Sequence, residues 1–202
     1  METQISQKDK DKIEAGIRRK YIKVAENPEG LFKYPTGRAG LDALGYDPGL
    51  IRALPEAVTA SYCGAGNPFS LGHINEGEAV LDIGCGAGVD TILAAMMVGP
   101  SGKVTGVDII PEMLQRAEEN LRMMDLKNVN FKNASGEKLP FEDNSFDVVI
   151  SNSVINLIPD KVGIMIEAMR MLKPGGRLML TDQIMVGQLK KDLKARIDSW
   201  FQ

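Results

Sequence analysis

Val80-Leu81-Asp82-Ile83-Gly84-Cys85-Gly86-Ala87-Gly88-Val89-Asp90, residues 80–90, is the stretch that decides the fold. The apolar run that ends at residue 83 is typical of a strand buried on both faces of a parallel sheet. Glycines at every second position from residue 84 allow positive φ angles and let a ligand approach the backbone closely. The apolar residues 91–98 predict a helix whose free N–H groups point back at that ligand. The stretch therefore predicts a strand, a turn and a helix that together bind a nucleotide-type cofactor.

The spacing of the glycines separates two classes of cofactor. A dinucleotide-binding turn reads Gly-x-Gly-x-x-Gly, and the end of its helix holds a pyrophosphate. Here the turn reads Gly-x-Gly-x-Gly, and Asp82 precedes the first glycine by two residues. A carboxylate at that place repels a pyrophosphate but suits a ligand that carries an ammonium group. The turn resembles motif I of the class I S-adenosylmethionine-dependent methyltransferases, so S-adenosylmethionine is the expected cofactor and S-adenosylhomocysteine the expected product.

Composition and charge narrow the class of partner. The chain has 202 residues, enough for one domain with an appendage, and its net charge is -3 with a pI near 5.3. This balance gives no general attraction to nucleic acid or to anionic membranes. No stretch reaches the roughly 18 apolar residues of a membrane span, and the N-terminus is charged rather than signal-like. We expect a cytoplasmic protein that acts on a small molecule, without nucleic acid or membrane partners.

The first 75 residues contain no sheet-forming run and predict a helical cap. Residues 1–26 place isoleucine and valine among charges at the spacing of a weakly amphipathic helix. Residues 27–47 are rich in glycine and proline, and residues 34–38 within them predict an ordered loop. Asp47-Pro48 then predicts a helix start, because Asp is a good N-cap and Pro suits the first helical position. We therefore divide the chain into a cap or lid, residues 1–75, and a cofactor-binding domain, residues 76–202.

Strand and helix patterns alternate after residue 78. This alternation predicts βαβ units and an α/β, Rossmann-like, doubly wound and mostly parallel sheet. Helices are expected to open at Pro111 and after Asp160, and the second should stop at Lys173-Pro174-Gly175-Gly176. The expected strands are residues 79–83, 103–108, 129–132, 146–151 and 177–182.

Polar residues stand at the carboxyl ends of these strands, where ligands bind in open α/β sheets. Asp108 follows the glycine turn by about twenty residues, where a carboxylate can accept both ribose hydroxyls. Any single Asp could instead cap a helix, but several polar residues at the expected places favour a binding site. They are Asp82, Asp108, Ser135, Ser151, Asn152 and Asp182.

The region from residue 34 to residue 182 resembles the arsenite methyltransferase family. The resemblance rests on five stretches, residues 34–38, 64–69, 98–102, 151–161 and 172–176. It implies that the amino-acid end of the cofactor lies at Asp82 and the turn glycines, and that Asp108 binds the ribose. It also implies that Ile109 lies against the adenine and that Ser135-Gly136 meets the adenine edge, although relatives often carry Asp in place of Ser135. The complete expected cofactor set is Asp82, Gly84, Gly86, Gly88, Asp108, Ile109, Ser135, Gly136 and Ser151.

Two positions depart from the pattern of that family. Ser153 and Ala65 stand where arsenite methyltransferases resemble one another in carrying cysteines, and a third such cysteine is expected beyond the point where this chain stops. Thiolate suits As(III), a soft ion, whereas a serine hydroxyl is a poor ligand for it at neutral pH. The sequence predicts methyl transfer to a small acceptor, arsenite or another soft nucleophile, by a variant that lacks the arsenic-binding cysteines of its family.

The acceptor end of the predicted site has few candidates for chemistry. Cys63 and Ser153 are the catalytic candidates, although a small apolar filler is the simpler interpretation of Cys63. Asn67, Phe69 and Asn152 are the substrate-binding candidates, and two cysteines make no metal site. The single histidine, His73, precedes the first strand, and a surface or capping role suits it better than a role as general base. No base is needed for a soft nucleophile, because the sulfonium methyl is already activated.

The end of the chain and the function leave alternatives open. Class I methyltransferases resemble one another in closing their sheet with an antiparallel hairpin, whereas residues 187–202 predict only a helix. A truncated chain, or a homodimer that covers the exposed sheet edge, would account for its absence. A non-catalytic S-adenosylmethionine-binding protein is the alternative function, which tight binding without methyl consumption would reveal. An NAD-dependent oxidoreductase ranks third, and absence of NAD binding would remove it.

Overall fold

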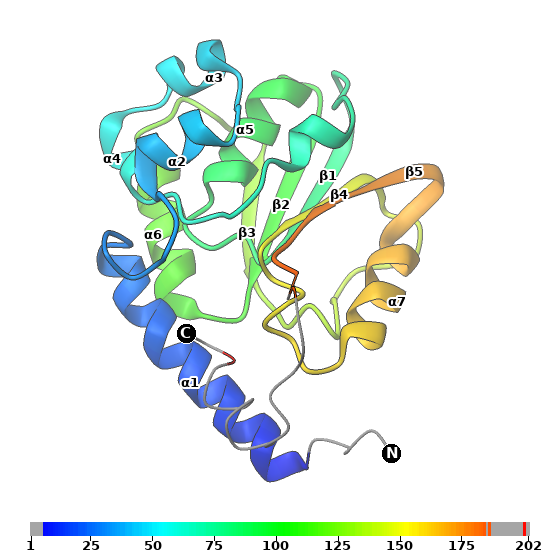
Figure 1. Ribbon diagram of the computed structural model, residues 1–202. Helices are drawn as coiled ribbons and strands as arrows, with labels where there is room; N and C mark the ends of the chain where they lie inside the picture. Colours follow the sequence, from blue (N-terminus) through cyan, green and yellow to red (C-terminus); the bar gives the residue numbers. More distant parts are fainter. Residues whose placement is uncertain (1–5, 185, 187–199, 201–202) are drawn as a thin grey trace.

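Five parallel strands form one sheet in the computed structural model, which describes residues 6–184, 186 and 200 (Figure 1). Their order is β3-β2-β1-β4-β5. Each neighbouring pair of strands is parallel. This order confirms the doubly wound α/β fold predicted from the sequence, with no antiparallel strand pair in the described part of the sheet. The strands are β1 (Ala79–Ile83), β2 (Lys103–Asp108), β3 (Val129–Asn133), β4 (Phe146–Asn152) and β5 (Leu172–Thr181).

Helices cover both faces of the sheet (Figure 1). On one face, α5 (Val89–Val98) packs against β1 and β2, and α6 (Pro111–Arg122) packs against β2 and β3. On the other face, α7 (Lys161–Met171) contacts β4 and β5. α5 begins directly after the glycine turn, so the predicted order of strand, turn and helix is confirmed.

The two central strands are apolar because both of their faces are covered. In β1, Val80 packs with α5 residues, whereas Leu81 packs with α7 residues on the opposite face. Both side chains are fully buried, as are Val148 and Val149 in β4. Successive residues of a strand point to opposite faces, so a strand between two helical layers needs apolar residues at every position.

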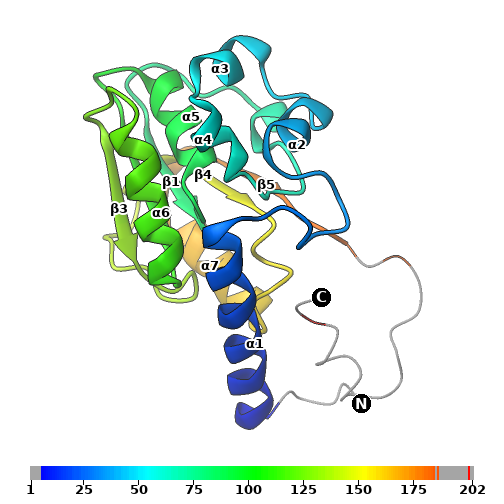
Figure 2. The ribbon, with the colours of Figure 1, turned by 90° about the vertical axis from the view of Figure 1, so that its left-hand side faces the viewer.

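Four α-helices and one 3₁₀ helix precede the sheet in the described residues. Three of the helices pack on α5 through buried Leu41, Ile51 and Val58. α1 instead lies apart from them, beside α6 (Figures 1 and 2), where Arg18 pairs with Glu112 at 3.7 Å. The division at residue 75 stays a prediction. The elements are α1 (Gln7–Glu26), α2 (Gly37–Ala43), α3 (Pro48–Ala53), α4 (Glu56–Ala60) and η1 (Pro68–Leu71).

α2 begins inside the ordered loop predicted over residues 34–38, so that prediction is wrong at residues 37 and 38. Gly40 explains how the helix forms there. A Cβ at Gly40 would lie 2.6 Å from the Pro35 carbonyl oxygen, so the close approach of the two segments requires glycine. Tertiary contact outweighs the low helix propensity of the segment. The predicted N-cap of the next helix is confirmed, because the Asp47 carboxylate accepts hydrogen bonds from the backbone N–H groups of Gly49 and Leu50.

β5 begins five residues earlier than the sequence predicted. Phe146 pairs with Leu172, but Val148 pairs with Arg177, so the residues between Leu172 and Arg177 form a bulge in the edge strand. Gly175 within the bulge has φ +81°, a conformation that favours glycine. The turn-like residues 173–176 therefore end the helix, as predicted. They also lie inside a strand, and their composition does not indicate this.

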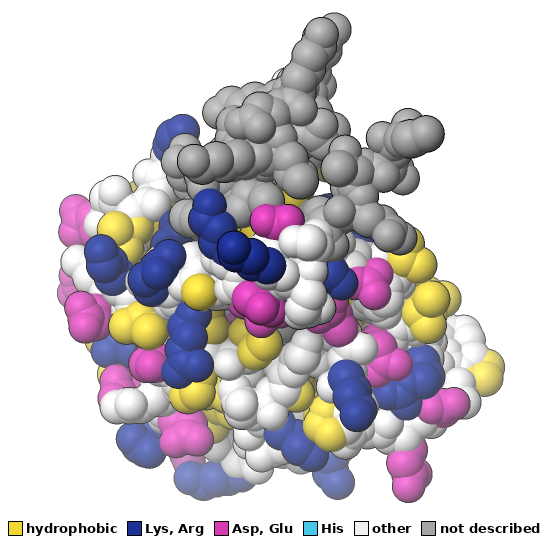
Figure 3. Space-filling model, turned by 90° about the horizontal axis from the view of Figure 1, so that it is seen from below, with side chains coloured by type: hydrophobic (Ala, Val, Ile, Leu, Met, Phe, Trp, Pro, Cys, Tyr) yellow, Lys and Arg dark blue, Asp and Glu magenta, His cyan; other side chains and the backbone are white. Residues whose placement is uncertain are grey.

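The far C-terminus lies mostly outside the described residues. The helix predicted over residues 187–202 falls there, apart from Trp200, whose indole N–H donates to the Leu157 carbonyl at 2.8 Å. Seen from below, the described surface intersperses positive and negative side chains (Figure 3). None of the helices that the structure describes is long and apolar enough to cross a membrane.

Candidate active site

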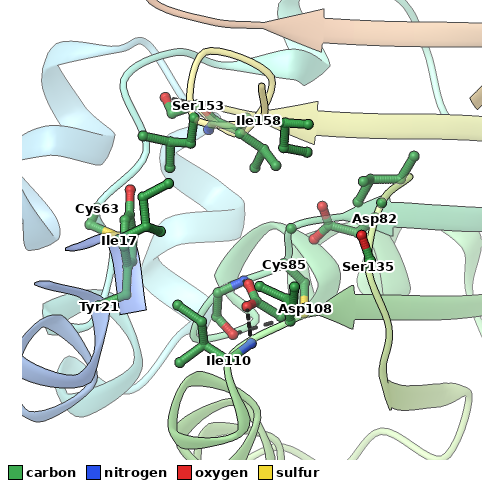
Figure 4. A pocket seen from close by; sticks show the side chains of 18 of the residues that line it. Ile17, Tyr21, Cys63, Asp82, Cys85, Asp108, Ile110, Ser135, Ser153 and Ile158 are labelled. Carbon is green, nitrogen blue, oxygen red and sulfur yellow. Dashed lines mark hydrogen bonds between the residues drawn. The ribbon is translucent and has the colours of Figure 1, made fainter. Parts of the chain in front are cut away.

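A cavity of about 520 Å³ opens at the carboxyl ends of the central strands. β1 and β4 are neighbours there, although β2 and β3 lie between them in the chain, so the cavity sits where the strand order reverses. Figure 4 shows side chains from several parts of the chain around it, among them Asp82 and Asp108 at the strand ends, Tyr21 of α1 and Ser153 after β4. The predicted residues therefore share the cavity with α1, whose position there the sequence did not predict.

Asp82 lines this cavity from the end of β1. Its side chain is 2% exposed, and the Thr91 hydroxyl donates a hydrogen bond to it at 2.6 Å. Burial raises the pKa of Asp82 to about 8, and the nearby Asp90 carboxylate adds to the shift. Among the described lining residues the only basic side chain is Arg18, which is exposed and pairs with Glu112. A cationic ligand group beside Asp82 would therefore favour the ionised form of this carboxyl.

Asp108 fixes the glycine turn from the end of β2. Its carboxylate accepts hydrogen bonds from the N–H groups of Gly86 and Ile110, both at 2.9 Å. Burial raises the pKa of Asp108 from its ordinary value. Ile109, beside it, lines the cavity and is 54% exposed, a large apolar side chain open to a ligand.

The turn glycines adopt the backbone conformation that the sequence predicted. Gly84 and Gly86 have φ angles of +72° and +52°, and both line the cavity. A Cβ at Gly84 would collide with Val154, so the segment after β4 packs directly on the turn. Gly88 lies outside the cavity lining, where it leaves room for Phe131 and Ala117. The turn therefore serves both the cavity and the packing of its own helix.

Ser135 and Gly136 line the cavity in the loop that follows β3. The Ser135 hydroxyl accepts a hydrogen bond from the Glu137 N–H at 3.2 Å, which shapes the loop. Gly136 packs against Ile164 of α7, whose Cδ1 would lie 2.8 Å from an added Cβ. In Figure 4, Ser135 and Asp82 lie at the opposite end of the cavity from Cys63.

Three further predicted residues have their side chains engaged outside the cavity lining. Ser151 donates its hydroxyl to the Ile83 carbonyl at 2.9 Å and is 2% exposed, so it ties β4 to β1. Asn67 caps η1 by accepting from the Phe69 N–H and donates to the Gly45 carbonyl. The Phe69 ring packs on Tyr46 with centroids 5.9 Å apart. These contacts serve the packing of the sheet and the cap.

Cys63 and Ser153 line the opposite, cap end of the cavity. Burial raises the pKa of the half-buried Cys63 to about 12, so its side chain is a neutral thiol at pH 7. Ser153 has φ +63°, which is unusual for a residue with a side chain, and its hydroxyl accepts from the Ala65 N–H at 2.9 Å. The buried Cys85 thiol also has a raised pKa, because burial and the Asp108 carboxylate disfavour its thiolate.

Asn152, a predicted substrate-binding candidate, belongs to a buried group of polar side chains behind this end, and the sequence did not predict that this group forms. Tyr46, Tyr62, Asp90 and Asn152, which we call the tyrosine network, join the cap to the sheet. The Tyr46 hydroxyl donates to Asp90 at 2.7 Å, and Asn152 Nδ2 lies 2.9 Å from the same carboxylate. Burial raises the pKa of Asp90 to about 6. No local pattern marks these residues, since Tyr46 and Asn152 are 106 positions apart.

The single histidine of the chain lies away from the cavity. His73 is exposed ahead of β1, outside the lining, and its carbonyl accepts from Arg177. No histidine or lysine is among the described residues that line the cavity. Within the part of the chain that the structure describes, no cluster of three or more His, Cys, Asp or Glu side chains could hold a metal ion.

Comparison with known proteins agrees with this geometry. A model of the methyltransferase domain family matches residues 74–202. The arsenite methyltransferase of Halobacterium salinarum is 34% identical over 212 residues, which cover 98% of this chain and 54% of that protein. The demethylmenaquinone methyltransferase of Listeria welshimeri is 38% identical over 114 residues, covering 56% and 48% respectively. An arsenic(III) S-adenosylmethionine methyltransferase structure from Chlamydomonas reinhardtii superposes with a TM-score of 0.61 at 37% identity, over 74% of this chain and 50% of that one.

These similarities confirm the predicted resemblance and the cofactor of the class, S-adenosylmethionine. The chain spans about half the length of the curated relatives it matches. Two of these relatives are named for different acceptors, arsenite and demethylmenaquinone, so their names alone do not assign an acceptor here.

Proposed function

Because the chain belongs to the methyltransferase domain family, we propose that it transfers the methyl group of S-adenosylmethionine to a small-molecule acceptor. The observation that carries the proposal is the single cavity shared by the glycine turn and the cap. Its strand-end side offers Asp82 and Asp108, and its cap side offers Tyr21, Cys63 and Ser153. A cofactor on the first side would direct its methyl group toward a molecule on the second.

The strand-end side fits the charge and shape of this cofactor. Asp82 would face the ammonium group of the amino-acid end, and Asp108 would accept from the ribose hydroxyls. Ile109, open to the cavity, would cover one face of the adenine, and Ser135-Gly136 would meet its edge. When bound, the cofactor supplies an activated methyl group on a sulfonium. The side chains of this chain orient the two reactants and exclude water, and such alignment can contribute about 7–11 kcal/mol.

The cap side favours an acceptor that needs no general base. No histidine or lysine lines the cavity in the described residues, and the pKa of Cys63 is raised to about 12. Ile17, Leu157 and Ile158 give this side apolar walls. A soft, uncharged nucleophile with a free electron pair can attack a sulfonium methyl without losing a proton first. We therefore rank soft nucleophiles, including arsenite, first among the possible acceptors.

Arsenite is the specific candidate, because two of the relatives are named for arsenic methylation. Neither cysteine in the described residues is poised as a thiolate, since burial raises the pKa values of both Cys63 and Cys85. Ala65 and Ser153, at the two positions where the family resemblance predicts cysteine, instead share a hydrogen bond. As(III) would therefore have to arrive already bound to small thiols, so arsenite methylation should require added glutathione.

The test combines binding with turnover. Calorimetry on the full chain should show S-adenosylhomocysteine binding, and incubation with S-adenosylmethionine, arsenite and glutathione should yield methylated arsenic by mass spectrometry. Asp108→Ala is the negative control for both steps. Omitting glutathione tests whether the protein's own thiols suffice, and a panel of small thiols and amines tests the wider acceptor class.

Each outcome decides between the functions. Methylated arsenic would establish the methyltransferase and its acceptor together. Binding followed by methylation of a thiol or an amine alone would keep the methyltransferase and remove arsenite. Tight binding without methyl consumption against the whole panel would overturn the proposal and favour a non-catalytic cofactor-binding protein.

A further inference from the structure

The loop of residues 63–66, which we call the wall loop, closes the cap side of the cavity. Cys63 and Gly64 line the cavity directly. Hydrogen bonds from several elements fix its backbone. The Tyr34 hydroxyl donates to the Cys63 carbonyl at 3.0 Å, and the Ala65 and Gly66 N–H groups donate to the Ser153 hydroxyl and the Asn152 side-chain oxygen. The position of this wall is therefore set by side chains that lie outside the loop.

The tyrosine network holds the far end of the same loop. The Gly66 carbonyl accepts from Tyr62 at 2.8 Å and lies 3.0 Å from the Tyr46 hydroxyl. Asn152 Nδ2 reaches the same carbonyl at 2.8 Å and the Asp90 carboxylate at 2.9 Å. A Cβ at Gly64 would collide with Asn152, so the loop also packs tightly on this side chain.

The network also touches the cofactor side of the cavity. Asp90 lies in the first turn of α5, directly after the glycine turn, and it lines the cavity. It is 8% exposed, and its two oxygens accept from Tyr46 of the cap and Asn152 of β4. One carboxylate therefore joins the helix that follows the cofactor turn to the loop that faces the acceptor.

We propose that Tyr46, Asp90 and Asn152 are positioning residues that hold the wall loop in place for the acceptor. The proposal rests on the proposed function, because it assigns the acceptor to this side of the cavity. None of the three needs to touch the acceptor. Their hydroxyl, carboxylate and amide act through the wall loop, so their loss should weaken acceptor binding far more than cofactor binding.

Tyr46→Phe is the sharpest variant. It removes the hydroxyl and keeps the ring that packs on Tyr62 and Phe69, with centroids 5.5 and 5.9 Å away. With arsenite and glutathione, we expect the acceptor KM to rise about tenfold, the size of effect of one buried hydrogen bond to a charged group. The Kd of S-adenosylhomocysteine should stay within about twofold of the wild-type value.

Amide hydrogen exchange at Ala65 and Gly66 gives a readout that does not depend on turnover. Exchange at both amides should be about tenfold faster in Tyr46→Phe, because the loop opens more often once one buried hydrogen bond of the network is lost. Asp147→Asn is the matched control. Asp147 also accepts two hydrogen bonds, from the Ala79 N–H and from Lys173, but it lies at the other end of the sheet.

The pH dependence of the acceptor KM distinguishes a positioning role of Asp90 from general destabilisation of the fold. The pKa of Asp90 is raised to about 6 by burial, and the groups that face it are Tyr46, Tyr62 and Cys63 from the cap, Asn152 from β4 and Asp82 from β1. Below that pH the carboxyl is protonated and accepts more weakly, so the wild-type acceptor KM should rise about fivefold between pH 7 and pH 5.5. Asp90→Asn keeps the shape and cannot titrate, so its KM should be flat over this range.

The outcomes are distinguishable from failure of the proposed function. If the wild type methylates no acceptor, the proposed function fails, and the exchange rates still decide whether the network holds the wall loop. Unchanged exchange in Tyr46→Phe would overturn the inference. So would a parallel loss of acceptor and cofactor affinity, since that pattern indicates general disruption of the fold.

Discussion

The strand-end floor of the cavity and its wall loop are held by different kinds of contact. The floor is built on one continuous segment, in which β1 passes through a turn at Gly84 and Gly86 into α5, and the Asp108 carboxylate at the end of β2 holds this turn. The wall loop of residues 63–66 is instead fixed by side chains from the cap and from β4. The floor therefore depends on its own backbone conformation and on a carboxylate of the adjacent strand, whereas the wall depends on several hydrogen bonds from side chains far away in the sequence.

This difference matters for the two ligands. A turn shaped by its own glycines and by the adjacent strand end can keep the same cofactor site when the acceptor side of the cavity changes. A loop that is fixed by distant side chains can change position when one of them changes. We infer that variants of the floor should affect cofactor binding and folding, whereas variants of the wall should affect mainly the acceptor.

The largest expected effect is on the floor. Asp108→Ala removes a carboxylate that accepts from the Gly86 and Ile110 N–H groups and would bind the ribose. Two hydrogen bonds to a charged group contribute about 3–6 kcal/mol, so the affinity for S-adenosylhomocysteine should fall more than 100-fold by calorimetry. Asp147→Asn should bind like the wild type. Unchanged affinity in Asp108→Ala would refute the proposed cofactor site.

A pair of glycine variants tests how far the floor depends on packing as well as on conformation. Gly88 and Gly175 have almost the same φ, +79° and +81°. A Cβ at Gly88 would lie 2.8 Å from Phe131 and 2.9 Å from Ala117, whereas nothing lies within 4 Å at Gly175. Gly88→Ala should lower the free energy of unfolding in urea by about 3 kcal/mol, and Gly175→Ala by about 1 kcal/mol. Equal losses would mean that conformation alone explains Gly88.

Proton release should accompany cofactor binding at the floor. The pKa of Asp82 is raised to about 8 in the ligand-free protein, so its carboxyl holds a proton at pH 7. A cationic ammonium nearby favours the carboxylate, so binding should release up to about one proton and affinity should increase as the pH rises from 6 to 8. Calorimetry of S-adenosylhomocysteine in phosphate and in Tris measures the release. Equal heats in the two buffers would exclude it, and Asp82→Asn should abolish it.

The smallest expected effect is on the wall. Ser153→Ala removes the hydroxyl that accepts from Ala65 and keeps a side chain at φ +63°, whereas Ser153→Gly removes the hydroxyl and relieves that conformation. Ser153→Ala should destabilise the protein by about 1–2 kcal/mol in urea unfolding, and Ser153→Gly by about 1 kcal/mol less. If both variants lost the same stability, the left-handed backbone at this position would carry no strain.

Local signals explain why most of the fold could be predicted from the sequence. Each of these signals lies within a few residues of the structure that it determines. Examples are the apolar run of β1, the glycines of the turn and the helix caps at Asp47 and Asp160. The structure differs where a distant contact outweighs the local signal. α2 forms where its buried Leu41 packs with residues of α4 and α5, and β5 starts early because Leu172, ahead of the bulge, pairs with Phe146 at the start of β4.

The residues of the candidate site also differ in whether local signals predict them. Asp82, Asp108 and the glycines could be found because each is a short distance from a strand end. Asn152 was also predicted at a strand end, but its contacts in the tyrosine network could not be, because the Tyr46–Asp90 bond spans 44 positions and the Asn152–Asp90 bond spans 62. α1 was predicted as a helix, but nothing in its own residues indicates that Ile17 and Tyr21 would line the cavity. Ser153 was chosen for the family resemblance, and its bond to Ala65, 88 positions away, follows only from the folded chain.

The hydrogen bond of Trp200 has a spectroscopic consequence. Trp200 is the single tryptophan of the chain, and its indole N–H donates to the carbonyl of Leu157, a residue that lines the cavity. The Lys161 ammonium lies 5.3 Å from the centre of its ring, and a nearby positive charge shifts indole emission. The tryptophan fluorescence of the unlabelled protein therefore arises from one indole beside the site. A titration that moves the segment after β4 should be visible as a change in that emission.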